Sequence, residues 1–311
     1  MNIIDQEFYS FLAKMDQMTE EEIFYNMKDR FLKLDPTLQN NFETFLNTFL
    51  FWGKLEREKQ NYEQIEKKAQ FLKKHGKDFL FLYQTLKDYR SKKILLAILR
   101  NYYYYDFKML SEVKETCYDH YFDLDLVSSS KDTIFVDVGA YTGDSIASFQ
   151  ANFPNQYQKI YGYEVTDASL ALLKDQYCLT NSILIQNKAV FDRKALVDVK
   201  INAVSDSSNR IVEDGGVVEA VSLDEDIQEP IGIIKMDIEG GEEKALLGAK
   251  KHLATEQPTL LISVYHGFMD LIRLPELILN INPQYDLYLR YYGNEVFPTE
   301  IVLIAIPKKK E

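Results

Sequence analysis

Apolar positions in residues 1–130 recur with the spacing of α-helices. One stripe at i, i+4, i+7, i+8, i+11 and i+12 lies on one face of a single helix and consists of Leu38, Phe42, Phe45, Leu46, Phe49 and Leu50. Thr19 followed by three glutamates predicts a helix start, because a threonine caps the first turn and carboxylates suit its positive end. This stretch holds two glycines and one proline, so it is predicted to be all-helical.

From residue 131 onward the pattern changes to short apolar runs separated by helical segments. The runs predicted to be strands cover residues 133–139, 159–165, 182–190, 231–238 and 259–266. Alternation of strands and helices predicts a parallel sheet covered on both faces. The last two runs, 285–292 and 300–307, leave no room for a helix between them and are predicted to form an antiparallel hairpin. This order is typical of Rossmann-like methyltransferases and less usual for NAD-binding domains.

The chain is therefore predicted to be an α/β protein with two domains. Residues 1–125 form an all-helical N-terminal domain that caps the second domain or forms a homodimer. Residues 126–311 form a Rossmann-like sheet domain.

Charge and composition limit the classes of molecule that the chain is expected to bind. With 36 basic and 48 acidic residues the net charge is −12, which disfavours nucleic acid as a partner. No apolar run reaches the roughly 18 residues of a membrane span, and two cysteines cannot build a disulfide framework. We expect a cytoplasmic protein.

Three segments allow alternative interpretations. Residues 54–74 are rich in lysine with interleaved glutamates, which favours a solvated helix face over a basic binding patch. The four tyrosines at 102–105 favour a packing seam between domains, with a platform for sugars or bases as the alternative. The polar residues 205–216 form either a surface loop or a flap over the site.

The first strand-to-helix turn, VDVGAYTGDS, has features of a ligand-binding loop. Asp137 lies near the strand end, Gly139 and Gly143 lie in the turn, and Asp144 begins the helix. Glu164 ends the next strand, where a carboxylate can accept both hydroxyls of a ribose. The segment GAYTGD lacks the G-x-G-x-x-G pattern of NAD binding, and its D-x-G-x-x-x-G spacing fits S-adenosylmethionine enzymes better.

Acidic residues also follow the fourth strand, in IIKMDIEGGEEKALLGAK. Asp237 and Glu239 are predicted to face the same side of the strand, at the edge where open α/β sheets bind ligands. His266, predicted to end the fifth strand, competes with these two acids as a general base. Two or three carboxylates are weak grounds for a divalent ion, so no metal site is predicted.

Together, VDVGAYTGDS and KMDIEGGEEKALLGA closely resemble the FkbM family of S-adenosylmethionine-dependent methyltransferases, over about residues 131–306. Tyr141 stands where this family commonly has asparagine. The resemblance implies O-methylation of a hydroxyl on a small molecule or sugar, with Asp237 at the methyl-transfer face. The residues that would bind the cofactor are Asp137, Gly139, Ala140, Tyr141, Gly143, Asp144 and Ser145 near the methionine part, Glu164 at the ribose, and Val165, Thr166, Asn187 and Ala189 near the adenine.

Two other function classes stay open at this point. An NAD- or nucleotide-sugar-dependent oxidoreductase would use the same fold, although the missing glycine pattern argues against it. A non-catalytic nucleotide-binding scaffold would bind a cofactor without turnover, and the set of Asp137, Glu164 and Asp237 weighs against that hypothesis.

Overall fold

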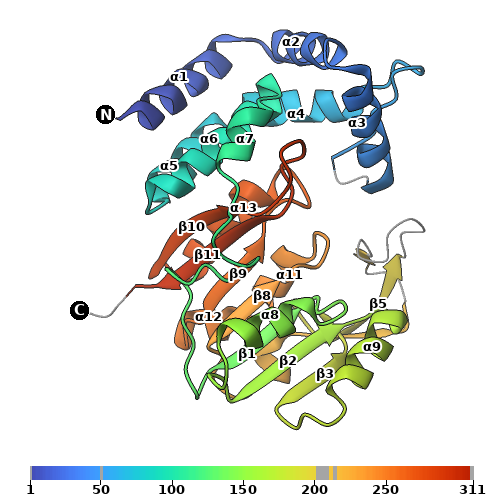
Figure 1. Cartoon of the computed structure of the whole chain (residues 1–311), viewed down its shortest axis with the longest axis vertical. Coiled ribbons are helices and arrows are strands. Elements are labelled where there is room, and N and C mark those ends of the chain that lie inside the picture. Colours follow the sequence, from blue (N-terminus) through green and yellow to red (C-terminus); the bar gives the residue numbers. More distant parts are fainter. Residues whose placement is uncertain (1, 50–51, 201–209, 213–215, 309–311) are drawn as a thin grey trace. The chain divides into compact units, whose positions relative to one another are not determined.

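The computed structural model describes the chain except for residues 1, 50–51, 201–209, 213–215 and 309–311 (Figure 1). Two compact units divide it. Unit 1 comprises Met1–Glu115, Val264–Ile272 and Tyr288–Ile301, and unit 2 comprises Thr116–Ser263, Arg273–Leu287 and Val302–Glu311. The sequence analysis placed one boundary at residue 125, whereas here the division follows Glu115 and two later segments join the helical unit.

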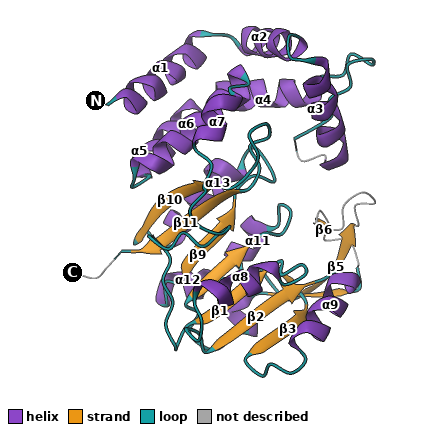
Figure 2. Ribbon diagram, in the orientation of Figure 1, coloured by secondary structure: helices purple, strands orange, loops and turns teal. Residues whose placement is uncertain are grey.

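In the described part of the chain, seven helices precede the first strand, as the shortage of glycine and proline predicted. Figure 2 shows the helices in purple. The predicted cap at Thr19 is confirmed, because its hydroxyl accepts from the Glu22 amide at 3.1 Å and the Glu22 carboxylate accepts from the Thr19 amide at 2.8 Å. The seven helices are α1 (Ile3–Gln17), α2 (Glu20–Leu32), α3 (Pro36–Phe49), α4 (Glu63–Lys74), α5 (Gly76–Thr85), α6 (Tyr89–Tyr104) and α7 (Phe107–Glu112).

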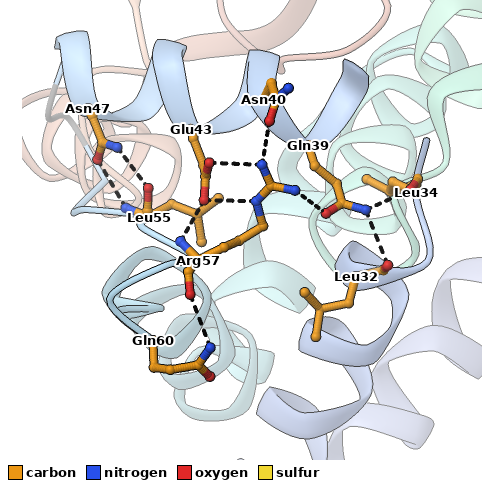
Figure 3. Close-up of polar contacts among 9 residues, drawn as sticks. All are labelled: Leu32, Leu34, Gln39, Asn40, Glu43, Asn47, Leu55, Arg57 and Gln60. Atoms are coloured by element: carbon orange, nitrogen blue, oxygen red, sulfur yellow. Dashed lines mark hydrogen bonds and ion pairs between the residues drawn. The ribbon is translucent and has the colours of Figure 1, made fainter. Parts of the chain in front are cut away.

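A polar cluster ties the loop before α4 to α3 (Figure 3). The Arg57 guanidinium donates to Gln39, Asn40 and Glu43, with its Nε 2.9 Å from the Glu43 carboxylate. Asn47 donates to the Leu55 carbonyl at 2.7 Å and accepts from its amide at 3.1 Å. These bonds satisfy polar groups of a loop that lies outside the regular helices and strands.

The two later segments pack into unit 1 through specific contacts. Trp52 Nε1 donates to the Tyr265 carbonyl at 3.2 Å. The Phe297 ring stacks on Phe45 with centroids 4.0 Å apart, and Arg290 pairs with Asp88 at 2.9 Å. Unit 1 is therefore completed by residues that follow the last parallel strand of the sheet.

A seven-stranded sheet with the order β10-β11-β9-β8-β1-β2-β3 forms the core of the α/β fold. Strands β1, β2, β3, β8 and β9 pair in parallel, and β11 lies between β10 and β9, antiparallel to β9. The predicted fold class is confirmed, including an antiparallel strand at the end of the chain. The strands are β1 (Ile134–Val138), β2 (Lys159–Glu164), β3 (Ile183–Asn187), β8 (Ile233–Met236), β9 (Thr259–Ser263), β10 (Tyr285–Tyr291) and β11 (Ile301–Pro307).

Helices follow the strands as the alternating pattern predicted. In α8, Phe149 stacks on Phe135 of β1 with centroids 4.3 Å apart, which fixes the helix that begins at the glycine turn. The helices of this part are α8 (Asp144–Asn152), α9 (Asp167–Tyr177), α10 (Leu223–Asp226), α11 (Glu242–Leu247), α12 (Lys250–Thr255) and α13 (Asp270–Ile281). Within the described ranges, no helix combines the length and hydropathy that a membrane crossing needs.

A second, small sheet was not predicted. It has the order β4-β7-β5-β6, from β4 (Ala189–Val190), β5 (Ala195–Lys200), β6 (Arg210–Val212) and β7 (Val218–Val221). The predicted single strand over 182–190 is wrong, since β3 pairs with β2 and β4 pairs with β7. Most of the polar segment 205–216 lies outside the described residues.

Candidate functional site

The turn after β1 requires glycine at two positions. Gly139 and Gly143 have φ of +82° and +89°, and a Cβ on Gly139 would lie 2.0 Å from the Asp237 carbonyl oxygen. The amides of Gly139 and Ala140 both donate to the Tyr163 carbonyl at 3.0 Å. The backbone of this turn therefore approaches the ends of β2 and β8 closely, at the edge where parallel sheets bind ligands.

The Glu164 carboxylate joins two loops of this edge. One oxygen accepts from the Tyr141 amide at 2.9 Å, and the other accepts from the amides of Val165 and Thr166 at 2.8 Å each. A carboxylate offers about four acceptor positions, so these three bonds leave capacity for a ligand hydroxyl. Asn187 is the register partner of Glu164 on β3, so the two residues lie side by side at this edge.

A buried ion pair stabilises the turn that follows β1. Lys235 of β8 is the register partner of Asp137 on β1, and its Nζ lies 3.0 Å from the Asp137 carboxylate. The same Nζ donates to the Gly139 carbonyl at 2.7 Å, and the Ser145 hydroxyl donates to Asp137. Burial lowers the pKa of Lys235, but attraction to Asp137 and Asp237 outweighs it and the net pKa is raised.

These bonds show what the side chains of Asp137 and Ser145 do in the fold. Their side chains bind each other and Lys235 inside the fold, and they hold the Gly139 turn in place. Direct contact of either side chain with a cofactor stays a prediction. Lys235 itself was not predicted; a lysine in the apolar run IIKMDI was the available signal.

The expectation that Asp237 and Glu239 share one strand face is wrong. Strand β8 ends at Met236, and Glu239 takes a left-handed conformation with φ +57°. Both acids therefore lie in a turn, where the alternation of a strand no longer applies. The Asp237 amide donates to the Val138 carbonyl at 3.0 Å, and the buried Glu242 carboxylate accepts from the Ile238 amide at 2.9 Å.

Tyr121 is a site residue that sequence reasoning missed. Its hydroxyl donates to Asp237 Oδ2 at 2.6 Å, and its ring centroid lies 5.3 Å from Lys235 Nζ. The backbone at Tyr121 has φ +73°, which is unusual for a residue other than glycine. No periodic pattern could indicate this contact, because Tyr121 lies in an irregular segment 116 residues before Asp237.

His120 accompanies Tyr121 in the same segment. The two rings stack with centroids 3.9 Å apart and planes 8° apart. Burial lowers the pKa of His120 to about 4, although the Asp237 charge opposes this effect. His120 is therefore neutral at pH 7, and its ring extends the aromatic surface of Tyr121, which contacts Asp237.

The prediction that His266 ends the fifth strand is wrong. Strand β9 ends at Ser263, three residues earlier, and His266 belongs to the segment Val264–Ile272 of unit 1. The imidazole is buried, and its ring lies 4.3 Å from that of Tyr265. Its assignment as a general base stays a prediction.

Comparison with known proteins identifies the family of this chain. A family model described as the methyltransferase FkbM domain matches residues 137–296. The chain belongs to the FkbM methyltransferase family. It is an S-adenosylmethionine-dependent methyltransferase, and the resemblance stated from VDVGAYTGDS and KMDIEGGEEKALLGA is confirmed.

Solved structures similar to this chain include a member of the same family, which shares its fold. A methyltransferase FkbM from Methylobacillus flagellatus KT is 23% identical with a TM-score of 0.67, over 88% of this chain and 71% of that chain. An rRNA methylase from Streptococcus thermophilus is 13% identical over 58% of this chain and 90% of its own, with a TM-score of 0.40. A Podospora anserina methyltransferase bound to S-adenosylhomocysteine is 10% identical over 57% and 72%, with a TM-score of 0.33. Comparison with curated proteins gave no match.

The residues at the carboxyl ends of β1, β2 and β8 fit this cofactor. Glu164 has acceptor capacity left for ribose hydroxyls, and the Gly139 turn lacks the glycine pattern that a pyrophosphate requires. The family assignment thus favours methyl transfer over the oxidoreductase alternative.

Proposed function

We propose that this enzyme methylates a hydroxyl group of a small molecule or sugar. S-adenosylmethionine, when bound, supplies a methyl group that is already activated on a sulfonium. The chain's own task is then to orient the acceptor and to take up its hydroxyl proton. The observation that carries the proposal is the Asp237 carboxylate, which follows β8 at the ligand edge and is oriented by Tyr121.

The roles of the other residues follow from their positions. Glu164 would hold the ribose, Val165, Thr166, Asn187 and Ala189 would lie near the adenine, and the turn from Gly139 to Asp144 would hold the methionine part. Asp237 is our first choice as the general base, and Glu239 and His266 are the alternatives. We further propose that the helical part, residues 1–125, covers the acceptor or forms a homodimer. We place the activity in the cytoplasm, since the chain has two cysteines and cannot build a disulfide framework.

A screen of hydroxylated acceptors with three variants tests the proposed base. Release of S-adenosylhomocysteine is measured for the wild type, Asp237→Asn, Glu239→Gln and His266→Gln. We expect Asp237→Asn to lower kcat by about 100-fold, because general bases typically contribute 100-fold or more, with unchanged cofactor affinity by calorimetry. Full activity in all three variants would contradict a proton-transfer role for these residues, and loss in His266→Gln alone would move the role there.

Replacing Tyr121 with phenylalanine tests its effect on Asp237. Without the hydroxyl, the Asp237 carboxylate loses the hydrogen bond that orients it. We therefore expect kcat to fall by about tenfold, which corresponds to one charge-assisted hydrogen bond.

The matched control is Tyr118→Phe, which alters a tyrosine of the same segment that bonds Asp125 instead. It should keep the wild-type kcat. A Tyr121→Phe variant with the wild-type kcat would show that the bond to Asp237 is structural alone.

A further inference from the structure

Lys68 is buried in a helix that the sequence predicted to be solvated. Lys68 of α4 is 4% exposed, whereas the preceding Lys67 keeps 52% of its side chain exposed and pairs with Glu63 at 2.6 Å. The helix therefore directs one lysine of this charged segment inward. An ammonium group in such a place loses its hydration and needs compensation from a partner.

No counter-charge compensates Lys68 among the residues that the structure describes. Its Nζ makes no hydrogen bond or ion pair with any of them and lies over two aromatic rings, 5.3 Å from the Tyr102 centroid and 5.4 Å from the Tyr105 centroid. Cation–π contacts offset part of the lost hydration but carry no negative charge. The hydroxyls of these two buried tyrosines also make no hydrogen bond to a described residue, so they add two donors beside Lys68.

Further rings surround these donors within unit 1. Phe268 meets the Tyr102 ring edge-on at 5.6 Å and stacks on Phe71 at 5.5 Å. Phe268 belongs to the segment Val264–Ile272, which continues from β9 and also contains His266. The chain thus joins the aromatic surroundings of Lys68 to a segment that carries a candidate base.

We propose that Lys68, with Tyr102 and Tyr105, binds an organic anion: a carboxylate, phosphate or sulfate attached to an apolar or ring-shaped body. The ammonium and the hydroxyls supply charge and donors, and the aromatic rings pack against the body. This anion site lies within unit 1 and does not rest on the proposed function.

The protonation of Lys68 gives this site a pH dependence. Burial lowers the pKa of Lys68 to about 7. The neighbouring Tyr102 and Tyr105 stay neutral because burial raises their pKa, and the charge of Asp270 raises the pKa of Tyr102 further. Lys68 is therefore charged below pH 7 and neutral at pH 9. An anion should bind well at pH 6 and at least about tenfold more weakly at pH 9, since the charge is then lost.

The experiment uses the full chain with sodium phosphate, sodium acetate, benzoate and phenyl phosphate as probes. Thermal unfolding and calorimetry are measured at pH 6 and pH 9 for the wild type, Lys68→Met and Lys67→Met. We expect the aromatic anions to raise the wild-type Tm at pH 6 and to bind more tightly than phosphate or acetate. Lys67→Met should behave as the wild type, and Lys68→Met should show no shift.

Without any probe, Lys68→Met should unfold at a higher temperature than the wild type at pH 6, because it removes an uncompensated buried cation. Equal anion effects in Lys68→Met and the wild type, or no effect in the wild type at either pH, would overturn the proposal. Calorimetry with S-adenosylmethionine on the same samples separates the two hypotheses. Intact cofactor binding with a failed anion test removes the anion site alone, whereas a wild type that binds no cofactor contradicts the proposed function.

Discussion

Replacing Glu164 with alanine is expected to lower the affinity for S-adenosylmethionine and S-adenosylhomocysteine by about 100-fold. The substitution removes the proposed ribose acceptor and leaves the amides of Tyr141, Val165 and Thr166 without their shared partner. Hydrogen bonds to a charged group contribute about 1.5–3 kcal/mol each, and 2.7 kcal/mol corresponds to about 100-fold. Isothermal titration calorimetry of the full chain measures this change directly.

The matched control for this prediction is Asp175→Ala, an exposed carboxylate on α9, the helix that follows the Glu164 loop. It should bind both ligands as the wild type does. Unchanged affinity in Glu164→Ala would remove the ribose assignment, since both carboxylate functions would then be dispensable.

Replacing Lys235 with methionine is expected to lower the free energy of unfolding by about 3–5 kcal/mol. The substitution leaves the Asp137 carboxylate buried without its cation and the Gly139 carbonyl without its donor. Because this pair lies beneath the cofactor turn, the affinity for S-adenosylmethionine should fall as well. Urea unfolding followed by circular dichroism gives the stability change.

The double variant Lys235→Met/Asp137→Asn separates loss of the charge from loss of packing. Asparagine keeps an acceptor for the Ser145 hydroxyl but carries no charge, so the double variant should recover most of the lost stability. A double variant less stable than Lys235→Met alone would contradict an uncompensated charge as the cause.

The sequence predicted the fold and one side of the site well, because both depend on local patterns. The strand that ends at Glu164 and the helix that begins at Asp144 lie where the apolar runs and the glycine turn indicated. The prediction that Asp237 and Glu239 face the same side of the strand is wrong, because the alternation of side chains ends with the strand at Met236.

Other site residues depend on contacts between distant segments and could not be predicted. Tyr121 reaches Asp237 from an irregular segment with a left-handed backbone, which no periodicity reveals. Lys68 lies in a segment whose charge pattern indicates a solvated helix, and its burial depends on how α4 packs with α6 and with Phe268. Strands β4 to β7 are short and partly polar, so their pairing became visible from the structure alone.

A crystal structure of the full chain with S-adenosylhomocysteine tests the central claim most directly. We expect the ribose hydroxyls within hydrogen-bond distance of the Glu164 carboxylate, with the amino-acid part against the turn from Gly139 to Gly143. A ligand bound away from Glu164 and this turn, or an edge that stays empty at saturating ligand, would contradict the account.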